Sequence, residues 1–268
     1  MKKFLLFGLA LSVFNFLGCS LQNETATAQT APTVEKQTDK KASIKSKTLV
    51  LVELFTSEGC SSCPPADRVL AQLEKDKSNS DAEIITLALH VDYWNYLGWK
   101  DEFSSAAYSQ RQNGYAEKFK LDSIYTPQMV VDGQTQFVGS NLDTANKAID
   151  EAAKSIKSNI EISSANDKLK VKISEIPTHD DAYIWLAIAE DNLKTSVKRG
   201  ENGGKTLEHV SVVRDLKLLG NLASADKTYE TETALQFDPK WRKENLKFVV
   251  FVQGKDSRKV FGVNKLDN

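Results

Sequence analysis

The sequence predicts an α/β domain followed by an all-β sandwich, and three observations lead to this fold class. Between about residues 48 and 158, apolar runs of strand length alternate with stretches of helical periodicity. From residue 159 to residue 268, about seven short strand-like runs are separated by polar turns. The chain has 268 residues, 41% apolar and 26% charged, which suits a soluble protein of two modest domains.

Residues 1–19 have the pattern of an export signal. A basic start, MKK, precedes a mostly apolar run at 4–17 that is too short to span a bilayer. The following motif, FLGC, resembles the lipobox of bacterial lipoproteins, and that resemblance implies lipidation of Cys19. Phe16 stands where that motif usually has Leu, so an ordinary signal peptide cleaved nearby is the alternative. We therefore expect an exported protein of the bacterial cell envelope, a periplasmic lipoprotein anchored to a membrane.

Residues 20–47 are rich in Thr, Gln, Ala and Lys and have almost no large apolar side chains. Such a segment cannot bury enough surface to fold, and we expect a disordered tether. Loss or lipidation of Cys19 leaves Cys60 and Cys63 as the only thiols in an oxidising setting. The net charge of −1 and the dispersed basic residues give no reason to expect a nucleic-acid partner.

The central motif is Cys60-Ser61-Ser62-Cys63, on a turn from a predicted strand to a predicted helix. A helix N-terminus offers unpaired N–H groups and partial positive charge, which stabilise a thiolate. We expect Cys60 to be the nucleophile, near the exposed mouth of the turn. Cys63, one turn behind, would attack the mixed disulfide and release the partner.

Two alternatives remain open for this pair. A purely structural disulfide would close so short a loop that it contributes only about 2 kcal/mol, against about 4.7 kcal/mol for a loop of about 100 residues. A zinc clip normally needs a second cysteine pair, which this chain lacks. Thiolates also suit Cu(I), so Cys60, Cys63 and His90 form an alternative metal set. If the pair carries out thiol–disulfide exchange, no cofactor is expected.

The elements that follow extend the pattern. A strand at 83–91, a helix near 102–119, a hairpin about Asp132-Gly133 and a closing helix after Ser140 give the order strand, helix, strand, helix, two antiparallel strands, helix. This order resembles the thioredoxin fold, as does Thr126-Pro127 immediately before the third strand. The resemblance implies a cis Pro127 facing the cysteine pair, with Thr126 presenting its backbone to the substrate chain.

Four runs in particular, FTSEGCSSCPPAD, HVDYWNYLGWKD, YTPQMVVDG and VVRDL, resemble the exported bacterial family known as domain of unknown function 1223. The resemblance covers most of the chain after the tether. It implies thiol chemistry in general, since the family's activity is not established by its name. Gly59 stands where thioredoxins have Trp, so reduction of diverse proteins is less well supported.

Other candidates lie around the cysteines. Trp94 and Trp99 belong to an aromatic loop that could wall a substrate groove or simply pack in the core. Glu53 is the one acid in the first strand; if buried, it could take the proton of Cys63, and thioredoxins have a buried acid at about this depth. The alternative is an outward-facing carboxylate. His90 is read as a hydrogen-bonded core residue more readily than as a ligand.

The expected function is that of an exported thiol–disulfide oxidoreductase acting on envelope proteins that carry cysteines or disulfides. The alternative is a thioredoxin-shaped binding module without redox turnover, for copper handling or envelope protein interaction. The expected sandwich at 159–268 could have an immunoglobulin-like architecture. It shows no catalytic constellation, because His179 and His209 stand alone in the sequence, and partner binding or scaffolding is its default role.

Overall fold

The structure is a computed structural model that describes residues 47–79 and 81–268. The expected signal at 1–19 with Cys19, and the tether up to residue 46, lie outside the described residues. Within the described part, no helix is long and apolar enough to cross a membrane.

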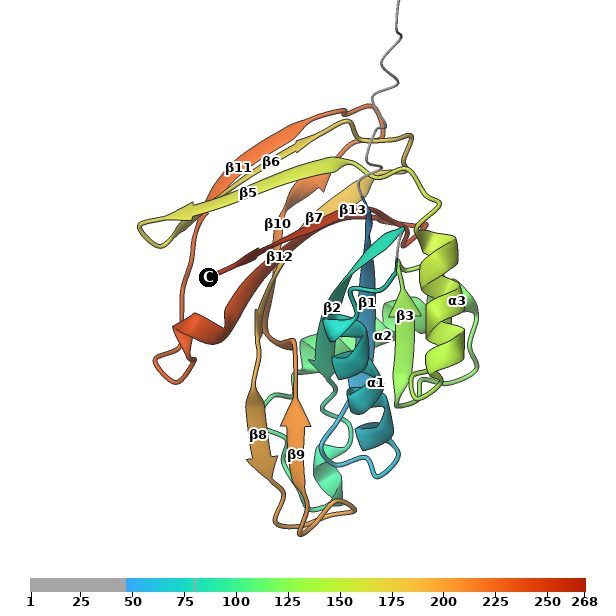
Figure 1. Cartoon of the computed structure of the whole chain (residues 1–268), viewed down its shortest axis with the longest axis vertical. Helices are drawn as coiled ribbons and strands as arrows, with labels where there is room; N and C mark the ends of the chain where they lie inside the picture. The colour runs from blue at the N-terminus through green and yellow to red at the C-terminus, as the bar shows by residue number, and fades with distance from the viewer. Residues whose placement is uncertain (1–46, 80) are drawn as a thin grey trace, which may run out of the picture. The chain divides into compact units, whose positions relative to one another are not determined.

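The first half of the folded chain has the predicted order of elements (Figure 1). They are β1 Thr48–Thr56, α1 Cys63–Lys75, β2 Ala82–His90, the short 3-10 helix η1 Asn95–Leu97, α2 Ala106–Phe119, β3 Gln128–Val131, β4 Thr135–Val138 and α3 Leu142–Ala152. The expected hairpin turn is present: Asp132 and Gly133 both adopt positive φ, and the Gln134 N–H donates to the Val131 carbonyl at 2.9 Å.

The second half is built of strands, as predicted. They are β5 Asn159–Ala165, β6 Lys168–Ser174, β7 Ala182–Glu190, β8 Leu193–Ser196, β9 Thr206–His209, β10 Val212–Leu222, β11 Tyr229–Ala234, β12 Leu246–Gly254 and β13 Val260–Asp267, with the 3-10 helix η2 Lys243–Asn245 before β12.

One eight-stranded sheet runs through both halves, in the order β13-β12-β7-β10-β2-β1-β3-β4. β1 pairs with β2 in parallel and with β3 in antiparallel fashion. The two halves join where Val212 of β10 pairs with Ala88 of β2. The loop between α3 and β5 coincides with the expected boundary at 158/159, but the sheet crosses it, so four strands of the expected sandwich extend the α/β sheet.

The burial of β7 and β12 explains this arrangement. All nine residues of β12 are buried, so this strand needs a layer on each face. On one side lies the separate three-stranded sheet β11-β6-β5, which Figure 1 shows arched over β7 and β12. The core between the two sheets includes Ile160, Leu169 and Val171 of the three-stranded sheet and Ile184, Leu186, Phe248 and Val250 of β7 and β12. The three-stranded sheet therefore packs against strands of the large sheet.

Strand β1 divides the core around the cysteine turn. Its residues Val50, Val52 and Leu54 pack with side chains of α1 and α3. Leu51 and Phe55 lie in a different cluster with Tyr108 and Tyr115 of α2. Because side chains alternate along a strand, every even-numbered position of β1 faces α1 and every odd-numbered position faces α2.

The last strand, β13, is hydrogen-bonded to the turn between β3 and β4. The Val260 N–H of β13 donates to the Asp132 carbonyl at 3.0 Å. The Lys157 ammonium donates both to the Asp132 carboxylate, at 2.6 Å, and to the Val260 carbonyl, at 2.7 Å. The β3–β4 turn and the start of β13 are thereby tied together, although they lie far apart in the sequence.

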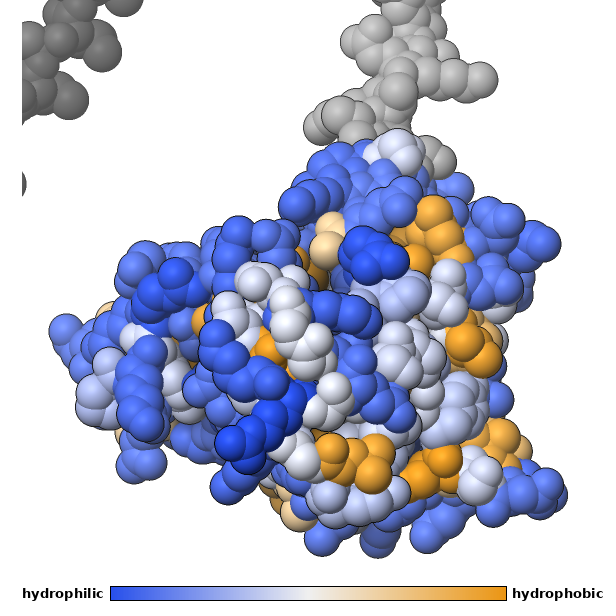
Figure 2. Space-filling view, turned by 90° about the horizontal axis from the view of Figure 1, so that it is seen from below, coloured by the Kyte–Doolittle hydropathy of each residue, from blue (hydrophilic) through white to orange (hydrophobic). Residues whose placement is uncertain are grey.

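Few large apolar side chains are exposed in the described part: Tyr96, Leu97, Val138, Ile156 and Leu218. On the face shown in Figure 2, apolar residues lie in small separate patches among polar ones.

Candidate functional site around the Cys60–Cys63 disulfide

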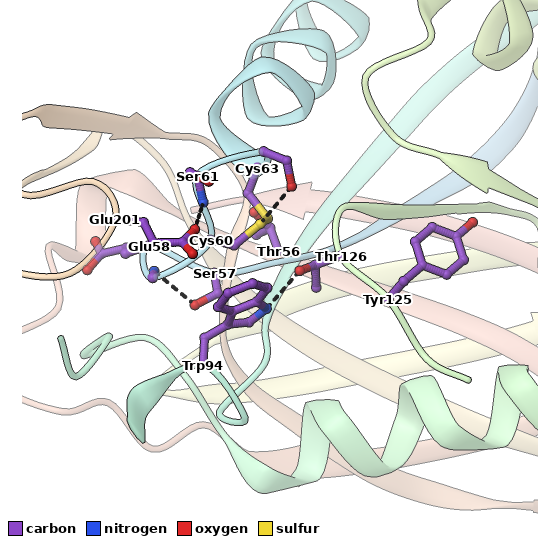
Figure 3. The surroundings of a disulfide bond; sticks show 12 residues. Thr56, Ser57, Glu58, Cys60, Ser61, Cys63, Trp94, Tyr125, Thr126 and Glu201 are labelled. Carbon is purple, nitrogen blue, oxygen red and sulfur yellow. Dashed lines mark hydrogen bonds between the residues drawn. A yellow bond between two sulfur atoms is a disulfide. The ribbon is translucent and has the colours of Figure 1, made fainter. Parts of the chain in front are cut away.

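The cysteine turn leaves the carboxyl end of β1 and enters α1. The Cys60 N–H donates to the Ser57 carbonyl, and the Cys63 N–H donates to the Cys60 carbonyl, both at 3.2 Å. Helix α1 begins at Cys63 with Pro in its first turn, where an N–H is dispensable. Cys60 and Cys63 form a disulfide with their Cα atoms 5.4 Å apart (Figure 3). The predicted strand, turn and helix are thus confirmed around the pair.

The exposure of the pair differs from the expectation. We expected Cys60 near an exposed mouth, but Cys60 and Cys63 each have 0% exposure, whereas Ser61 and Ser62 between them are exposed. The Cys60 Sγ atom lies 3.3 Å from the Ser62 hydroxyl. The expectation of an exposed Cys60 was therefore wrong, and a segment much later in the chain binds the backbone of this turn.

That segment is the loop between β8 and β9, residues 197–205, here called the tip loop. The Asn202 carboxamide donates to the carbonyls of Glu58 and Cys60, each at 2.9 Å, and Asn202 is fully buried. The exposed Glu201 carboxylate accepts the Ser61 N–H at 2.9 Å, and its hydrogen bonds with Ser61 hold the pKa of Glu201 below its usual range. The tip loop therefore binds the cysteine turn on both sides of Cys60.

The segment before β3 that contains Thr126 and Pro127, here called the proline loop, also lies near the cysteine pair. The Thr126–Pro127 peptide bond is cis, as predicted, and Pro127 is buried. The Trp94 indole N–H donates to the Thr126 hydroxyl at 2.8 Å, as Figure 3 shows. A Cβ atom on Gly59 would lie only 3.1 Å from the Trp94 Cβ. Trp94 thus bridges the cysteine turn and the proline loop, and its closeness explains why Gly precedes Cys60.

The other aromatic residues of the loop that follows β2 lie in different environments. The Trp99 indole N–H donates to the Glu58 carboxylate at 2.8 Å, so Trp99 also contacts the cysteine turn. Tyr93 packs against the core beside α2. Tyr96 is 82% exposed and stands clear of both. Trp94 and Trp99, which were expected to line a groove, both lie at the cysteine turn.

Glu53 lies elsewhere. Its carboxylate is 1% exposed and accepts hydrogen bonds from Arg111, at 2.5 Å and 2.9 Å, and from the Tyr115 hydroxyl. Position 53 is odd, so the side chain faces α2, whereas Cys63 belongs to α1 on the opposite face of the sheet. Burial of Glu53 was expected as one possibility. The expected proton transfer with Cys63 is not supported, because the strand alternation points the two groups apart.

A buried polar cluster, His90, Asp101, His209 and Glu58, adjoins the cysteine turn. His90 Nδ1 lies 2.7 Å from the Asp101 carboxylate, which also accepts the Glu58 N–H at 2.9 Å. His209 Nε2 lies 3.2 Å from the Glu58 carboxylate, and the two imidazole rings are 5.0 Å apart. Burial alone would lower the pKa of His90, but the Asp101 carboxylate raises it above the usual value.

Sequence reasoning missed most of this cluster. His209 stands alone in the sequence, and only the packing of β9 against α1 brings it to Glu58 and to the ring of His90. The signal that was available is the parallel pairing of β1 and β2, which sets His90 opposite Thr56 at the ends of their strands. Among the described residues, His90 Nε2 has no hydrogen-bond partner.

Asp67 is a further residue that the sequence analysis did not single out. It lies four positions after Cys63 on α1, hence on the same side of the helix. The Thr56 hydroxyl donates to its carboxylate at 2.8 Å. Burial raises the pKa of Asp67, an effect that His209 and His90 partly offset. The four-residue spacing from Cys63 was the available signal.

The alternative metal set is not brought together. Among residues 47–79 and 81–268, no group of three or more His, Cys, Asp or Glu side chains is placed to hold a metal ion. His90 turns its Nδ1 to Asp101, and the two sulfurs are bonded to each other. The expected set of Cys60, Cys63 and His90 is therefore corrected: the structure does not form it.

The comparisons with known proteins bear on the whole folded part. A family model matches residues 51–253, which include the cysteine turn, the proline loop and the tip loop. The chain belongs to the family described as protein of unknown function DUF1223.

Two solved structures resemble this DUF1223 chain. The crystal structure of an Agrobacterium tumefaciens protein is 24% identical, with a TM-score of 0.67, over 83% of this chain and 95% of that one. HBP35 of Porphyromonas gingivalis is 13% identical, with a TM-score of 0.56, over 82% of this chain and 75% of that one. At these identities the likeness concerns the fold. No curated protein matches the sequence closely enough to count as a relative.

In this DUF1223 chain the sequence runs that carried the resemblance converge in space. The first supplies Glu58 and both cysteines, and the second supplies His90, Trp94 and Asp101. The third supplies Thr126 and Pro127, and the fourth begins with Val212, the residue that joins β10 to β2. These runs therefore build one place in the fold, where the Cys60–Cys63 disulfide adjoins buried polar side chains.

Proposed function

We propose that this protein is an exported thiol–disulfide oxidoreductase that acts on cysteines or disulfides of envelope proteins through a thioredoxin-like site. The observation that carries the proposal is the Cys60–Cys63 disulfide at the N-terminus of α1. Thr126, which precedes the cis Pro127, is among the residues that surround it (Figure 3). A turn of this kind gives a thiolate the N–H groups and partial charge that activate it.

The arrangement of the first half supports the thioredoxin-like assignment. The strand order β2-β1-β3-β4 has β3 and β4 antiparallel to their neighbours, and the cysteine turn leaves the carboxyl end of the parallel strand β1. Ligands of open α/β sheets tend to bind at such an end. Helices α1 and α3 cover one face of these strands and α2 covers the other.

The proposed reaction is a two-step exchange. The Cys60 thiolate attacks one sulfur of a substrate disulfide, which breaks that bond, forms a mixed disulfide and releases the first substrate thiolate. Cys63 then loses its proton and attacks the Cys60 sulfur, which restores the Cys60–Cys63 disulfide and releases the second substrate thiolate. Two electrons pass to the substrate, and the two thiol protons end on its sulfurs. The reverse sequence oxidises a substrate dithiol.

We propose that Asp67, and not Glu53, is the general base that accepts the proton of Cys63. Asp67 shares the helix side of Cys63, and its carboxyl is joined to Thr56, which also lies among the residues around the disulfide (Figure 3). A carboxyl with a raised pKa is better matched to exchange a proton with a thiol. Thr126 is the proposed backbone contact for the substrate. Trp94 bonds to Thr126, and Trp99 bonds to Glu58 of the cysteine turn, so both are proposed substrate contacts.

The proposal is tested by trapping. Cys63→Ser should accumulate mixed disulfides with envelope proteins, because Cys60 can attack and nothing resolves the product, whereas Cys60→Ser should not. Both variants are compared with wild type on non-reducing gels after acid quenching. Equal absence of trapped proteins in both variants, with a wild type that fails to exchange with protein disulfides, would overturn the redox assignment.

The anchor is a separate proposal with its own test. We propose that Cys19 carries a lipid, so that the mature protein is held at a membrane of the bacterial envelope. Metabolic labelling with a fatty acid should mark wild type and should be lost in Cys19→Ser. A wild-type protein that is soluble and unlabelled after export would remove the anchor and leave the exported oxidoreductase.

A binding module without redox turnover is the second candidate. The complete burial of both sulfurs favours it, because a turnover enzyme must expose at least one. Cu(I) titration of the reduced protein separates the copper-handling form of this candidate from simple protein interaction, since two thiolates are the ligands present. A glutathione-buffer titration of the same sample tests redox poise.

A further inference from the structure

The tip loop reaches the cysteine turn from far along the chain. Asn202 and Glu201 follow Cys60 by more than a hundred residues, yet their side chains bond to Glu58, Cys60 and Ser61 in one continuous stretch of backbone. Figure 3 shows Glu201 beside Ser61, next to the disulfide.

We propose that Asn202 and Glu201 are positioning residues for Cys60, which clamp the disulfide closed against protein substrates until the tip loop lifts. The inference rests on the proposed function and concerns access to the same pair.

Access is the first part of the argument. Exchange requires an attacking sulfur to approach Cys60 along the disulfide bond, and Cys60 and Cys63 both have 0% exposure. The buried Asn202 carboxamide uses its two N–H donors on carbonyls on either side of Gly59. Lys205 in turn donates to the Asn202 oxygen at 3.0 Å, which fixes the amide orientation. The tip loop therefore binds the backbone of Cys60 itself, directly beside a sulfur that has no exposure.

Charge is the second part. Glu201 places a carboxylate on the Ser61 N–H, beside the positive end of α1. In the reduced protein the Cys60 thiolate is stabilised by this same end of the helix. A neighbouring carboxylate disfavours that thiolate, since like charges oppose each other. Lifting the tip loop would therefore uncover Cys60 and increase its thiolate character together.

The construction of the hairpin allows such a movement. Strands β8 and β9 form their own two-stranded sheet outside the large one. Gly200 and Gly204 adopt positive φ within the tip loop, and its residues 198–205 are exposed apart from Asn202. The strands of the hairpin are held by buried Thr195, Leu207 and His209. The bonds of Asn202 and Glu201 can break while these strands stay in place.

The test compares Asn202→Ala and Glu201→Gln with wild type and with Glu208→Gln. Glu208 is an exposed acid on the same hairpin that pairs with Lys194, so it controls for loss of a charge. The oxidised full-length proteins are mixed with dithiothreitol or with a reduced protein dithiol such as thioredoxin. The rate at which the Cys60–Cys63 bond is reduced is followed by acid quench and mass spectrometry.

We expect Asn202→Ala to speed reduction by the protein dithiol by about tenfold or more, because two hydrogen bonds no longer hold the loop. The gain with dithiothreitol should be smaller. In the reduced proteins near pH 7, an alkylating agent should modify Cys60 about two- to fivefold faster in Glu201→Gln than in wild type. Glu208→Gln should match wild type in both assays.

Equal reduction rates for wild type and Asn202→Ala, together with equal alkylation rates for wild type and Glu201→Gln, would overturn the clamp. Because Glu201 is exposed, its variant tests the charge argument even where Asn202→Ala is poorly folded. These rates are measured on the protein's own disulfide. They are thus independent of turnover with envelope substrates, whose absence would instead count against the proposed function.

Discussion

Arg111 donates two hydrogen bonds to the carboxylate of Glu53 in the interior between β1 and α2. The Tyr115 hydroxyl bonds to the same carboxylate, and Gln253 of β12 donates to that hydroxyl at 2.8 Å. The pair therefore ties α2 to strands from both halves of the large sheet. Its role is to hold the fold together, and the charge of Glu53 is compensated where it lies.

Arg111→Met should be strongly destabilising, because it leaves the Glu53 carboxylate buried without its cation. We expect the free energy of unfolding to fall by about 3–5 kcal/mol. Urea denaturation followed by circular dichroism measures this loss. Arg68→Met, an exposed substitution on α1, is the control and should change stability by less than about 0.5 kcal/mol. Similar values for both variants would mean that the buried pair contributes little.

Asp67→Asn should slow the second step of the exchange and leave the first unchanged. An amide cannot take the Cys63 proton, and general-base groups contribute about a hundredfold or more to such steps. Stopped-flow measurement of mixed-disulfide resolution, started from a preformed Cys60 adduct, isolates that step. In wild type its rate should rise with pH through the raised pKa of Asp67, and the variant should lose this limb. Glu53→Gln is the control, and a loss equal to that of Asp67→Asn would restore the original assignment.

The same substitution has an opposite effect on stability. A carboxyl whose pKa is raised by burial stabilises the fold below its unfolded value, and that contribution is lost as pH rises through the folded value. Asp67→Asn should therefore be at least as stable as wild type at pH 7 and lose this advantage in acid. Denaturation at several pH values checks the sign.

The pair of His90 and Asp101 should produce a window of pH in which it stabilises the fold most. The folded pKa of His90 is raised, so its contribution is full below the unfolded value of about 6.5 and is lost as pH rises through the folded value. Burial acts to raise the pKa of Asp101, but His90 lowers it overall, so its contribution is lost as pH falls below about 3.9 and through the folded value. Wild type should thus exceed Asp101→Asn most between these limits. A difference that is constant from pH 4 to 9 would contradict the pairing.

Gly133→Ala should be far more damaging than Gly98→Ala, although both glycines have positive φ. A Cβ atom at Gly133 would clash with the backbone carbonyl of Arg258, where the approach to β13 meets the β3–β4 turn. At Gly98 the same atom meets nothing within 4 Å, so only backbone strain of about 1 kcal/mol remains. Thermal unfolding of the two variants separates these effects. Equal losses would mean that the closure at Gly133 is loose.

The elements of the first half could be predicted because local signals specify them. The apolar run of β1, the Pro residues after Cys63 and the Asp132-Gly133 turn each act over a few residues. The neighbours of the later strands could not, because an apolar run such as β12 shows that it is buried but not which strand it pairs with.

The site follows the same division. The cysteine pair and Pro127 belong to short motifs, whereas Asn202 reaches Cys60 through a hairpin whose position depends on the whole second half. Burial of Glu53 was one of two positions that its sequence neighbours left open. Its partner was not foreseeable, because Arg111 sits in the weakly amphipathic helix α2, where nothing in the sequence marks it as inward-facing.

The pairing of Val212 with Ala88 has a consequence for the order in which the protein is made. Ribosomes deliver β2 about 120 residues before the strand that covers its edge, and contacts so distant along a chain form late. Until then the end of β2 at Ala88 lacks this partner, and an unpaired strand edge can pair with other chains. The tip loop arrives in the same late portion. Every new molecule therefore passes through a stage in which Cys60 and Cys63 are present and the hydrogen bonds from Asn202 and Glu201 are not, so an oxidant at that stage acts on the pair without them.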